Sequence, residues 1–419
     1  MSAQGCLERV LQVDTRLVPL HDINQVNMSP EKNRNRQMKK PTNSLSTAGM
    51  LLTTLVLCAC SKSTPEASLP VAAANLDGLD PGWNVIEPAG DTVCSDSSPY
   101  RFFVRPGAGD KLMVFFQGGG ACWTGGSCDP DLEPTYRINL QEVDPQKYNG
   151  IFLAGSPENP LRDHSVVFAP YCTADVHIGD AVANYEAPEV EEHISHPVTV
   201  QHKGYINAEA VLEWTFAHFF TPSEIFVTGS SAGSIPSPYY AMRIGEHYPD
   251  ARIAQLGDGS GGYRLNGQES RPQDKWGTLG RLRQLPELES LASEEFNYEI
   301  LYIAAAKRQP DIMFAQYDTA EDVTQKRFLA IEDAVPDSLL DNIKANQADI
   351  QKEVSNFHSY IAGGDLHTIL GRPEFYSYQV DGTLLSDWVA ALVNGEVISD
   401  VHCNDCSRPE VLAISISAH

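Results

Sequence analysis

Residues 225–233 read Ile-Phe-Val-Thr-Gly-Ser-Ser-Ala-Gly, and this stretch decides the fold prediction. The apolar run is typical of a buried strand, and the Gly-Ser-Ser-Ala-Gly motif after it matches a tight strand-to-helix turn that raises a serine hydroxyl to the top of a sheet. Glycine at positions 229 and 233 leaves room for the sharp turn and for close helix packing. The alternative is a glycine-rich turn that only closes a strand. We predict that Ser231 is a nucleophile.

A serine nucleophile needs hydrogen-bond donors for the oxyanion that its attack creates. Residues 111–116 form a buried-strand pattern that leads directly into Gln-Gly-Gly-Gly-Ala-Cys-Trp at 117–123. This order resembles the HGGG-type loop, whose backbone N–H groups act as such donors. Gly119 and Gly120 are the preferred donors, together with the amide of Ala232 after the nucleophile. The alternative is a flexible loop at a strand end.

The acid that orients the base is expected in the loop after a later strand. Residues 311–317 form a buried-strand pattern, and 318–323 open a helical segment. Asp318 and Asp322 are both contenders. Either can instead be a helix N-cap or a first-turn carboxylate, which the helix dipole favours.

The base is expected in a loop after the last strand. Residues 357–362 predict this strand, and Gly-Gly-Asp-Leu-His-Thr follows at 363–368. We therefore predict His367 as the general base, against the alternative of an exposed loop histidine. His358 lies inside the strand and His402 lies beside cysteines, so both are poorer candidates. The other histidines show no metal-ligand spacing and are interpreted as structural or solvated, so neither a metal nor a cofactor is predicted.

The alternation of strands and helices predicts an α/β protein with one catalytic domain and a doubly wound, mostly parallel central sheet covered by helices on both faces. The segment 263–302 is the best candidate for a small cap, whereas the acidic helix at 337–354 is interpreted as a surface helix. Pro236 and Pro238 predict a short or kinked helix after the nucleophile. The expected strands lie near residues 100–105, 111–117, 165–170, 224–229, 252–257, 311–317 and 357–362.

These motifs together resemble the pectin acetylesterase and Notum family of serine carboxylesterases, in its bacterial branch. The resemblance rests on Gly-Gly-Gly-Ala-Cys-Trp at 118–123, Gly-Ser-Ser-Ala-Gly at 229–233, Tyr-Asp-Thr-Ala-Glu-Asp at 317–322 and Asp-Leu-His-Thr-Ile-Leu at 365–370, and it covers about residues 85 to 410. It implies an α/β-hydrolase fold without a cofactor. It implies the roles of nucleophile, acid and base for Ser231, Asp322 and His367, with oxyanion donors at Gly119, Gly120 and Ala232.

The sequence departs from the family pattern at two places. Many members carry a bulky aromatic residue where this chain has Gly120 or Ala121, and many carry cysteine before the nucleophile where this chain has Ser230. These differences leave the shape of the pocket open.

The N-terminal residues resemble a bacterial lipoprotein precursor. Residues 38–60 combine a basic start, an apolar run at 50–57 that is too short to span a membrane, and Leu-Cys-Ala-Cys ending at Cys60. We expect cleavage before Cys60, lipidation of Cys60, a flexible tether at 61–84 and a catalytic domain at 85–419. Residues 1–37 are interpreted as a non-native upstream extension, with a real extension as the alternative. The expected location is the outer membrane or cell surface, and periplasmic or ordinary secretion is the alternative.

Cysteine usage fits export. The chain has nine cysteines, and removal of Cys6, Cys58 and Cys60 leaves an even number, which suggests three disulfides among fifteen possible pairings. Short loops favour Cys122 with Cys128 and Cys403 with Cys406, which leaves Cys94 with Cys172. A zinc site at His402, Cys403 and Cys406 is the rival interpretation, but it lacks a fourth ligand.

Charge and motifs together define the expected activity. The net charge of −25 and the absence of a basic stripe exclude nucleic acid as a partner. The acidity also argues against a polyanionic substrate and for a neutral ester or a heavily esterified polymer. We predict a monomeric serine carboxylesterase that removes an O-acetyl or other short acyl group, on a glycan or a small alcohol. The alternatives are a lipid deacylase or lipase with a longer pocket, and an inactive hydrolase-fold binding protein.

Overall fold

The computed structural model describes residues 72–190, 193–264, 271–331 and 334–412. The expected signal segment, the lipidation site at Cys60 and residues 61–71 of the expected tether lie outside the described residues. Among the described helices, none combines the length and the apolar character needed to cross a bilayer.

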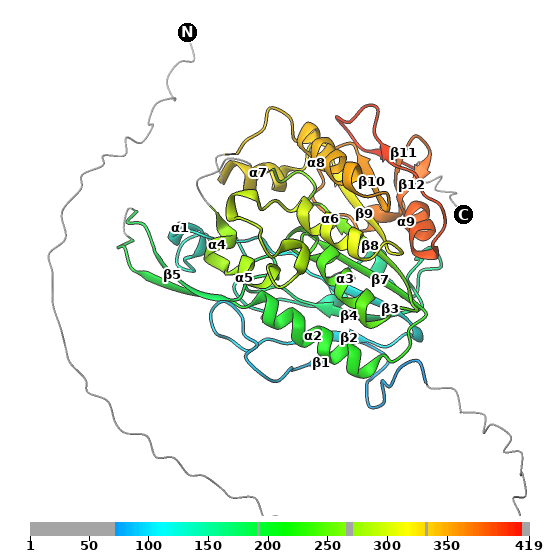
Figure 1. Cartoon of the computed structure of the whole chain (residues 1–419), viewed down its shortest axis with the longest axis horizontal. Coiled ribbons are helices and arrows are strands. Elements are labelled where there is room, and N and C mark those ends of the chain that lie inside the picture. Colours follow the sequence, from blue (N-terminus) through cyan, green and yellow to red (C-terminus); the bar gives the residue numbers. More distant parts are fainter. Residues whose placement is uncertain (1–71, 191–192, 265–270, 332–333, 413–419) are drawn as a thin grey trace, which may run out of the picture. The chain divides into compact units, whose positions relative to one another are not determined.

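A nine-stranded sheet forms the centre of the described chain (Figure 1). Its strand order is β1-β2-β4-β3-β7-β8-β9-β10-β13. The neighbouring strands from β4 to β13 in this order are parallel. The β1–β2 and β2–β4 pairs are antiparallel. The seven predicted strands are all present, and the two short edge strands, β1 and β13, were not predicted. The strands are β1 (Asn84–Ile86), β2 (Phe102–Arg105), β3 (Ala108–Phe116), β4 (His164–Ala169), β7 (Glu224–Ser230), β8 (Arg252–Asp258), β9 (Met313–Thr319), β10 (Phe357–Ala362) and β13 (Val401–His402).

The register of the parallel strands brings their carboxyl ends to one edge of the sheet. Phe116 pairs with Gly229, Ser230 pairs with Asp258, and Asp258 pairs with Tyr317. The loops that follow β3, β7, β9 and β10 therefore leave the sheet side by side. These are the loops that carry the residues predicted to act together, as expected for ligand sites in open α/β sheets.

Helices pack along the sheet, and Figure 1 shows α2, α3 and α6 in front of it. α3 packs against β7, β8 and α6, and α6 packs against α8, which also contacts β10. The helix expected at 337–354 is α8, which packs against β10 at the side of the sheet. The helices with their bounds are α2 (Gly204–His218), α3 (Ser237–His247), α6 (Glu299–Arg308), α7 (Val323–Ile331), α8 (Leu339–Glu353) and α9 (Leu385–Asn394).

The prolines predicted a short or kinked helix after the nucleophile motif, and the helix there begins only at Ser237. A 3₁₀ turn at Ser231–Gly233 precedes α3, which starts at Ser237 with a proline in its first turn. Proline fits there because the first N–H groups of a helix have no intrahelical acceptor. The expected cap segment contains short helices, α4 (Pro272–Trp276) and α5 (Thr278–Leu282).

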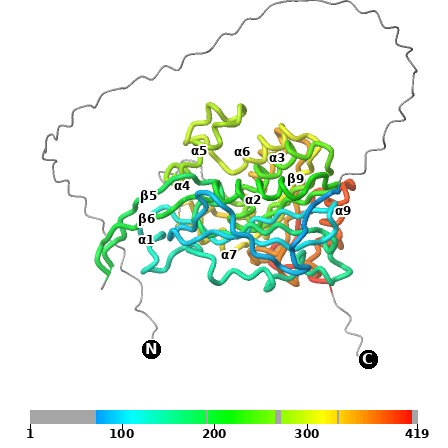
Figure 2. The backbone as a smooth tube through the Cα atoms, turned by 90° about the horizontal axis from the view of Figure 1, so that it is seen from below, coloured from blue at the N-terminus to red at the C-terminus, as the bar shows by residue number. Residues whose placement is uncertain are grey.

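A two-stranded hairpin, which the sequence did not predict, extends away from the sheet (Figures 1 and 2). It consists of β5 (Ala181–Glu186) and β6 (Pro197–His202), paired antiparallel, and α1 (Gly125–Cys128) packs against both strands. A separate small sheet joins β11 (Tyr378–Val380), β12 (Thr383–Leu384) and β14 (Glu410–Val411) near the end of the chain.

Three disulfides are present among the described residues, in the pairing that the loop lengths favoured. They join Cys94 to Cys172, Cys122 to Cys128 and Cys403 to Cys406. The rival zinc interpretation near the C-terminus fails, because both sulfur atoms are used in a disulfide and His402 Nε2 lies 2.9 Å from Ser359 Oγ.

Candidate active site

His367 connects Ser231 to Asp322 at the carboxyl edge of the sheet. Its Nε2 lies 2.7 Å from Ser231 Oγ, and its Nδ1 lies 2.7 Å from Asp322 Oδ2. Asp322 cannot donate when ionised, so Nδ1 carries a proton and Nε2 is free to accept one from the serine hydroxyl. The arrangement is that of a nucleophile, a base and an orienting acid.

Asp322 is at once the partner of His367 and the N-cap of α7. Its Oδ1 accepts hydrogen bonds from the backbone N–H groups of Thr324 and Gln325, and its Oδ2 accepts one from Gln325 Nε2. The carboxyl group is fully buried. Helix N–H groups favour the ionised form of a carboxylate, so this fold position supplies a buried negative charge beside the imidazole.

Asp318, the other contender, lies inside β9 and is also fully buried. Its hydrogen-bond donors in the described chain are Gly261 N and Gln325 Nε2. Burial raises the pKa of Asp318 to about 8, with the nearby Asp322 charge acting in the same direction. The shared Gln325 thus joins the two carboxyl groups, and burial disfavours ionisation of Asp318.

The turn that presents Ser231 has a strained backbone. Ser231 adopts φ = +55°, a left-handed conformation that is unfavourable for a non-glycine residue. A Cβ atom at Gly229 would lie 2.1 Å from the Gly233 carbonyl oxygen, and one at Gly233 would lie 2.1 Å from the Phe116 carbonyl oxygen. Glycine is therefore required at both positions of the motif for the turn to close against β3.

The glycine loop after β3 lies beside this turn. Gly120 adopts φ = +80°, and a Cβ there would lie 2.0 Å from the Thr135 carbonyl oxygen. Within the described chain, the backbone N–H groups of Gly119, Gly120 and Ala232 donate to no other residue. The loop is fixed at its start, where His177 Nε2 lies 2.8 Å from the Gln117 carbonyl oxygen and must donate to it.

A buried segment at 174–177, which the sequence analysis missed, supports the glycine loop. Ala174, Val176 and His177 all have positive φ angles, of 63°, 47° and 60°. The carboxyl group of Asp175 holds this strained backbone by accepting hydrogen bonds from Thr173, His177 N and Gly204 N. The sequence gives little signal of such a segment, because alanine and valine occupy two of its three positions of positive φ.

Asp258 at the end of β8 links the nucleophile turn to the histidine loop and was also missed. Its carboxylate accepts from Ser230 Oγ at 2.8 Å and from the backbone N–H groups of Ile369 and Leu370 at 3.1 Å. These amides follow His367 by two and three residues. One buried carboxyl group therefore sets the distance between the loops that carry Ser231 and His367.

Two cavities open at Ser231. A narrow one of about 40 Å³ is mostly apolar, and Tyr263, Pro272 and Trp276 of the expected cap segment form part of its wall. A wider groove of about 560 Å³ contains Ser231 and His367 on its floor. The residues shared by both cavities are Gly120, Ser231 and Phe328.

The other histidines have different surroundings. His358 lies at the start of β10, at the other end of the strand from the loop of His367. Its Nδ1 lies 3.5 Å from Asp400 Oδ1. His402 forms a hydrogen bond with Ser359. His177 and His202 are buried and hydrogen-bonded, as the structural interpretation expected. His193 and His196 do lie together, around Asp129, although the sequence analysis found no metal-ligand spacing among these residues.

The parallel sheet and the strand-to-helix turn place the chain in the α/β-hydrolase class. The family model described as pectinacetylesterase matches residues 78–331, which is more than half of the chain. The chain therefore belongs to the pectinacetylesterase family and is a carboxylic ester hydrolase. The matched residues include Ser231 and Asp322 and end before His367. A search of curated proteins found no match.

We predict that the buried carboxyl groups make stability depend on pH. Burial raises the pKa of Asp258 to about 6, of Asp175 and Glu299 to about 7, and of Asp318 to about 8. Each group binds its proton more tightly in the folded chain than in the unfolded one. The contribution of these four groups to the free energy of unfolding therefore falls as the pH rises from about 4 to 8. His177 and His202, whose pKa burial lowers to about 4, contribute in the opposite direction below about pH 6.5.

Urea unfolding at a series of pH values measures this dependence. Asp318→Asn removes one of the titrating groups, so its curve should be flatter between pH 4 and 8, by up to about 1.4 kcal/mol per pH unit. Asp311→Asn changes an exposed aspartate near the start of the same strand and should leave the curve unchanged. Parallel curves for Asp318→Asn and the unchanged protein would contradict the prediction.

Proposed function

We propose that the protein is a serine esterase in which Ser231, His367 and Asp322 form the catalytic triad. The observation that carries the proposal is the position of His367, 2.7 Å from both the serine hydroxyl and the buried carboxylate. Ser231 Oγ attacks the acyl carbonyl carbon while His367 Nε2 takes its proton. That proton then passes to the departing alcohol, and an acyl-enzyme remains.

Water completes the cycle by the reverse sequence. His367 takes a proton from the water as it attacks the acyl carbon, and Ser231 leaves with that proton. In both steps the negative carbonyl oxygen accepts hydrogen bonds from the amides of Gly119, Gly120 and Ala232, which have no other acceptor in the described chain. Asp322 holds the Nδ1 proton and stabilises the imidazolium.

The acyl group is proposed to be acetyl or a similarly short chain. The apolar cavity beside Ser231 has a volume of only about 40 Å³, room for about three water-sized spheres. Trp123, Ile235 and Trp276 form part of its wall and are almost fully buried. A long acyl chain would need these packed side chains to move, so the cavity favours a short-chain esterase over a lipid deacylase.

The alcohol is proposed to be a glycan that carries negative charge, as the family name suggests for a pectin-type polymer. The wide groove at Ser231 contains Lys147 and Arg372, and no aspartate or glutamate is among the described residues that line it. A second groove of about 570 Å³ meets it at Gly119 and Phe328 and adds two cations, Arg137 and Arg327, and one carboxylate, Glu142. Cationic side chains along both grooves suit a polyuronate better than a neutral ester.

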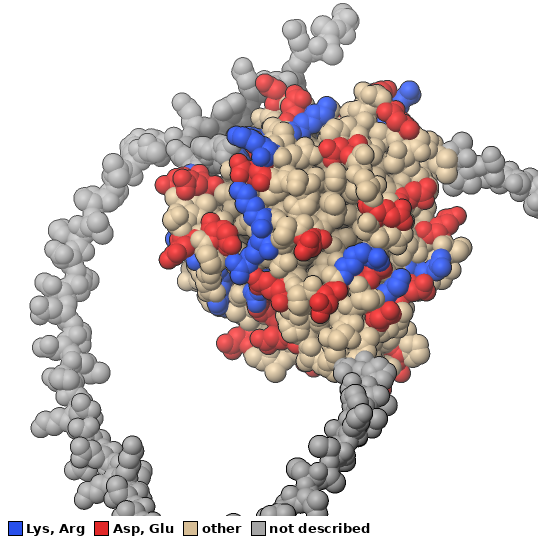
Figure 3. All heavy atoms as spheres, turned by 45° about the vertical axis from the view of Figure 1, so that its right-hand side comes forward, with Lys and Arg blue, Asp and Glu red and all other residues tan. Residues whose placement is uncertain are grey.

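This local charge differs from the net charge of the chain. On the face shown in Figure 3, acidic and basic side chains are interspersed rather than separated into large fields. With a Debye length of about 8 Å at physiological salt, distant surface carboxylates are largely screened at the groove. The net charge of −25 therefore does not oppose an anionic substrate at this site.

The protein is further proposed to be exported and anchored through a lipid on Cys60. The Leu-Cys-Ala-Cys motif supports this proposal, as do the three disulfides, which persist in oxidising compartments.

Replacement of Ser231 tests the mechanism. Ser231→Ala should lower kcat on an acetyl ester by roughly ten-thousandfold or more and abolish labelling by a fluorophosphonate, while the protein stays folded. His367→Ala should cause a similar loss, whereas His402→Ala should retain most of the activity. Full activity in Ser231→Ala, or equal losses in both histidine variants with folded protein, would refute the assignment.

Replacement of groove cations tests the substrate. Arg372→Gln and Lys147→Gln should each raise KM for an acetylated polyuronate several-fold and leave KM for p-nitrophenyl acetate unchanged, because only the polymer fills the groove. Arg162→Gln provides the control, since Arg162 lies before β4 beside Asp163. An unchanged KM for the polymer in both groove variants would exclude the charged-glycan proposal without affecting the esterase proposal.

Fractionation of bacterial cells that express the full chain tests the anchor. The unchanged protein should appear in the membrane fraction and incorporate labelled fatty acid. Cys60→Ala should abolish both, whereas Cys6→Ala should change neither. Soluble, unlabelled wild-type protein would contradict the proposal.

A further inference from the structure

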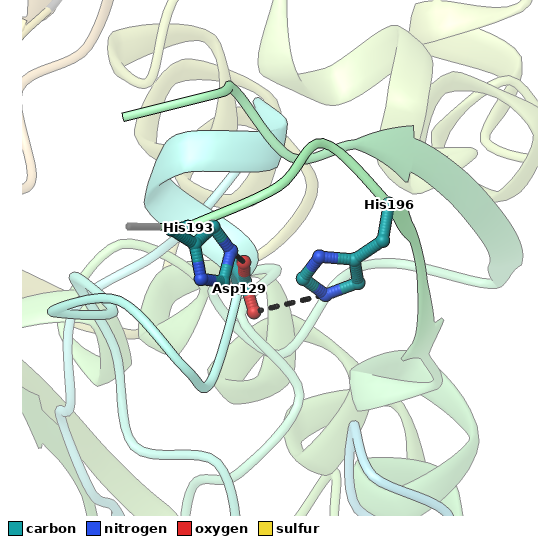
Figure 4. Close-up of side chains that lie close together, drawn as sticks. All are labelled: Asp129, His193 and His196. Atoms are coloured by element: carbon teal, nitrogen blue, oxygen red, sulfur yellow. Dashed lines mark hydrogen bonds and ion pairs between the residues drawn. The ribbon is translucent and has the colours of Figure 1, made fainter. Parts of the chain in front are cut away.

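Asp129, His193 and His196 form a cluster away from the proposed active site (Figure 4). Asp129 follows α1, and the two histidines lie on the segment that joins β5 to β6. His193 Nε2 lies 2.8 Å from Asp129 Oδ2, and His196 Nε2 lies 3.6 Å from Asp129 Oδ1. The three potential ligand atoms lie within 4.8 Å of one another.

The orientation of His196 is that of a metal-binding imidazole. Its Nδ1 lies 3.2 Å from the Ile194 carbonyl oxygen, which can only accept, so Nδ1 carries the proton in this contact. In the neutral ring the lone pair is then on Nε2, the atom that faces the carboxylate. A lone pair and a carboxylate oxygen repel each other unless a cation lies between them. Histidine ligands of metals commonly donate their second N–H to a backbone carbonyl in this way.

The carboxylate itself lacks the usual counter-charge. Asp129 is fully buried, and no lysine or arginine of the described chain forms an ion pair with it; its ion-pair partners are the two histidines. Its Oδ1 also accepts a hydrogen bond from the backbone N–H of Asp131 at 3.0 Å. A buried carboxylate without a permanent cation beside it is costly unless it is paired or bound to a metal. We propose that Asp129, His193 and His196 bind a divalent transition-metal ion of the zinc type, with water completing a tetrahedral site.

The donor set and its access fit such an ion. Imidazole nitrogen and carboxylate oxygen suit Zn²⁺, at ligand distances of about 2.0 to 2.2 Å. His193 and His196 are 21% and 36% exposed in their side chains, and His196 borders a surface groove lined also by Tyr136 and Pro197. An ion can therefore reach the site from solvent, and on binding it would replace the direct contact of His193 with Asp129.

The site would join two separate parts of the fold. The Cys122–Cys128 disulfide closes the loop that continues the glycine segment, and Asp129 comes directly after it. His193 begins the return of the hairpin, where its backbone pairs with Val190. A bound ion would therefore tie the outer end of the hairpin to the base of the glycine loop, so its role is structural rather than catalytic.

Zinc titration of the chelator-treated protein, without a polyhistidine tag, tests the proposal. Calorimetry should show one Zn²⁺ bound per chain, and the melting temperature should rise with Zn²⁺ concentration. Co²⁺ in place of zinc should give the visible absorption of a tetrahedral site. His193→Ala and His196→Ala should each weaken binding by more than about tenfold.

The control is His247→Ala, which removes an exposed histidine that stacks on Phe216, and it should bind zinc as the unchanged protein does. Circular dichroism checks the fold of each variant. His196→Ala removes a partly exposed ring, so its loss of binding reports on the ligand rather than on folding. Absence of binding in the unchanged protein, or undiminished binding in a folded His196→Ala variant, would overturn the proposal.

Discussion

Close packing of backbone against backbone between the end of β3 and the turn after β7 determines the position of Ser231. The Phe116 carbonyl oxygen occupies the space that a side chain at Gly233 would need, and the Gly233 carbonyl does the same at Gly229. This contact brings the glycine loop and the serine together, because both leave paired parallel strands at the same level. Strain at Ser231, with φ = +55°, is tolerated since the surrounding backbone leaves no other path.

Buried carboxyl groups connect the remaining loops to this turn. Asp258 binds Ser230 and two amides of the histidine loop, Asp322 binds His367 and the start of α7, and Asp175 holds the strained segment beside the glycine loop. Burial of several like charges near one another is unfavourable, and raised pKa values of Asp258 and Asp175, to about 6 and 7, show how the fold limits that cost. Asp322 differs from these two groups in its surroundings, because backbone amides at the start of α7 and the imidazole of His367 contact its carboxyl group. The same type of side chain thus links backbone segments in some places and orients the imidazole in another.

The sequence revealed those parts of the site that depend on local chemistry. Gly229 and Gly233 are required by the turn itself, and the apolar runs before each loop predicted seven of the nine central strands. Asp258 could not be recognised, because its role depends on amides more than one hundred residues away, and Asp175 owes its position to three positive φ angles, two of them in alanine and valine. The hairpin of β5 and β6 was missed because its strands expose one face and lack a buried apolar run. Because the hairpin was not predicted, the approach of His193 and His196 to Asp129 was not predicted either. No spacing along the chain encodes this approach.

The choice between Asp318 and Asp322 shows why position in three dimensions decides function. Both follow the same apolar run, and both bind Gln325. The strand ends at Thr319, so Asp318 is still held in the sheet among buried side chains, whereas Asp322 lies at the beginning of a helix and faces the histidine loop. The effect of charge on a substrate also depends on position in three dimensions. The net charge is a sum over the whole surface, but a substrate responds to the few side chains within a Debye length. The lysine and arginine that line the groove at Ser231 are Lys147 and Arg372, and no described aspartate or glutamate lines it, so an acidic protein presents a basic groove.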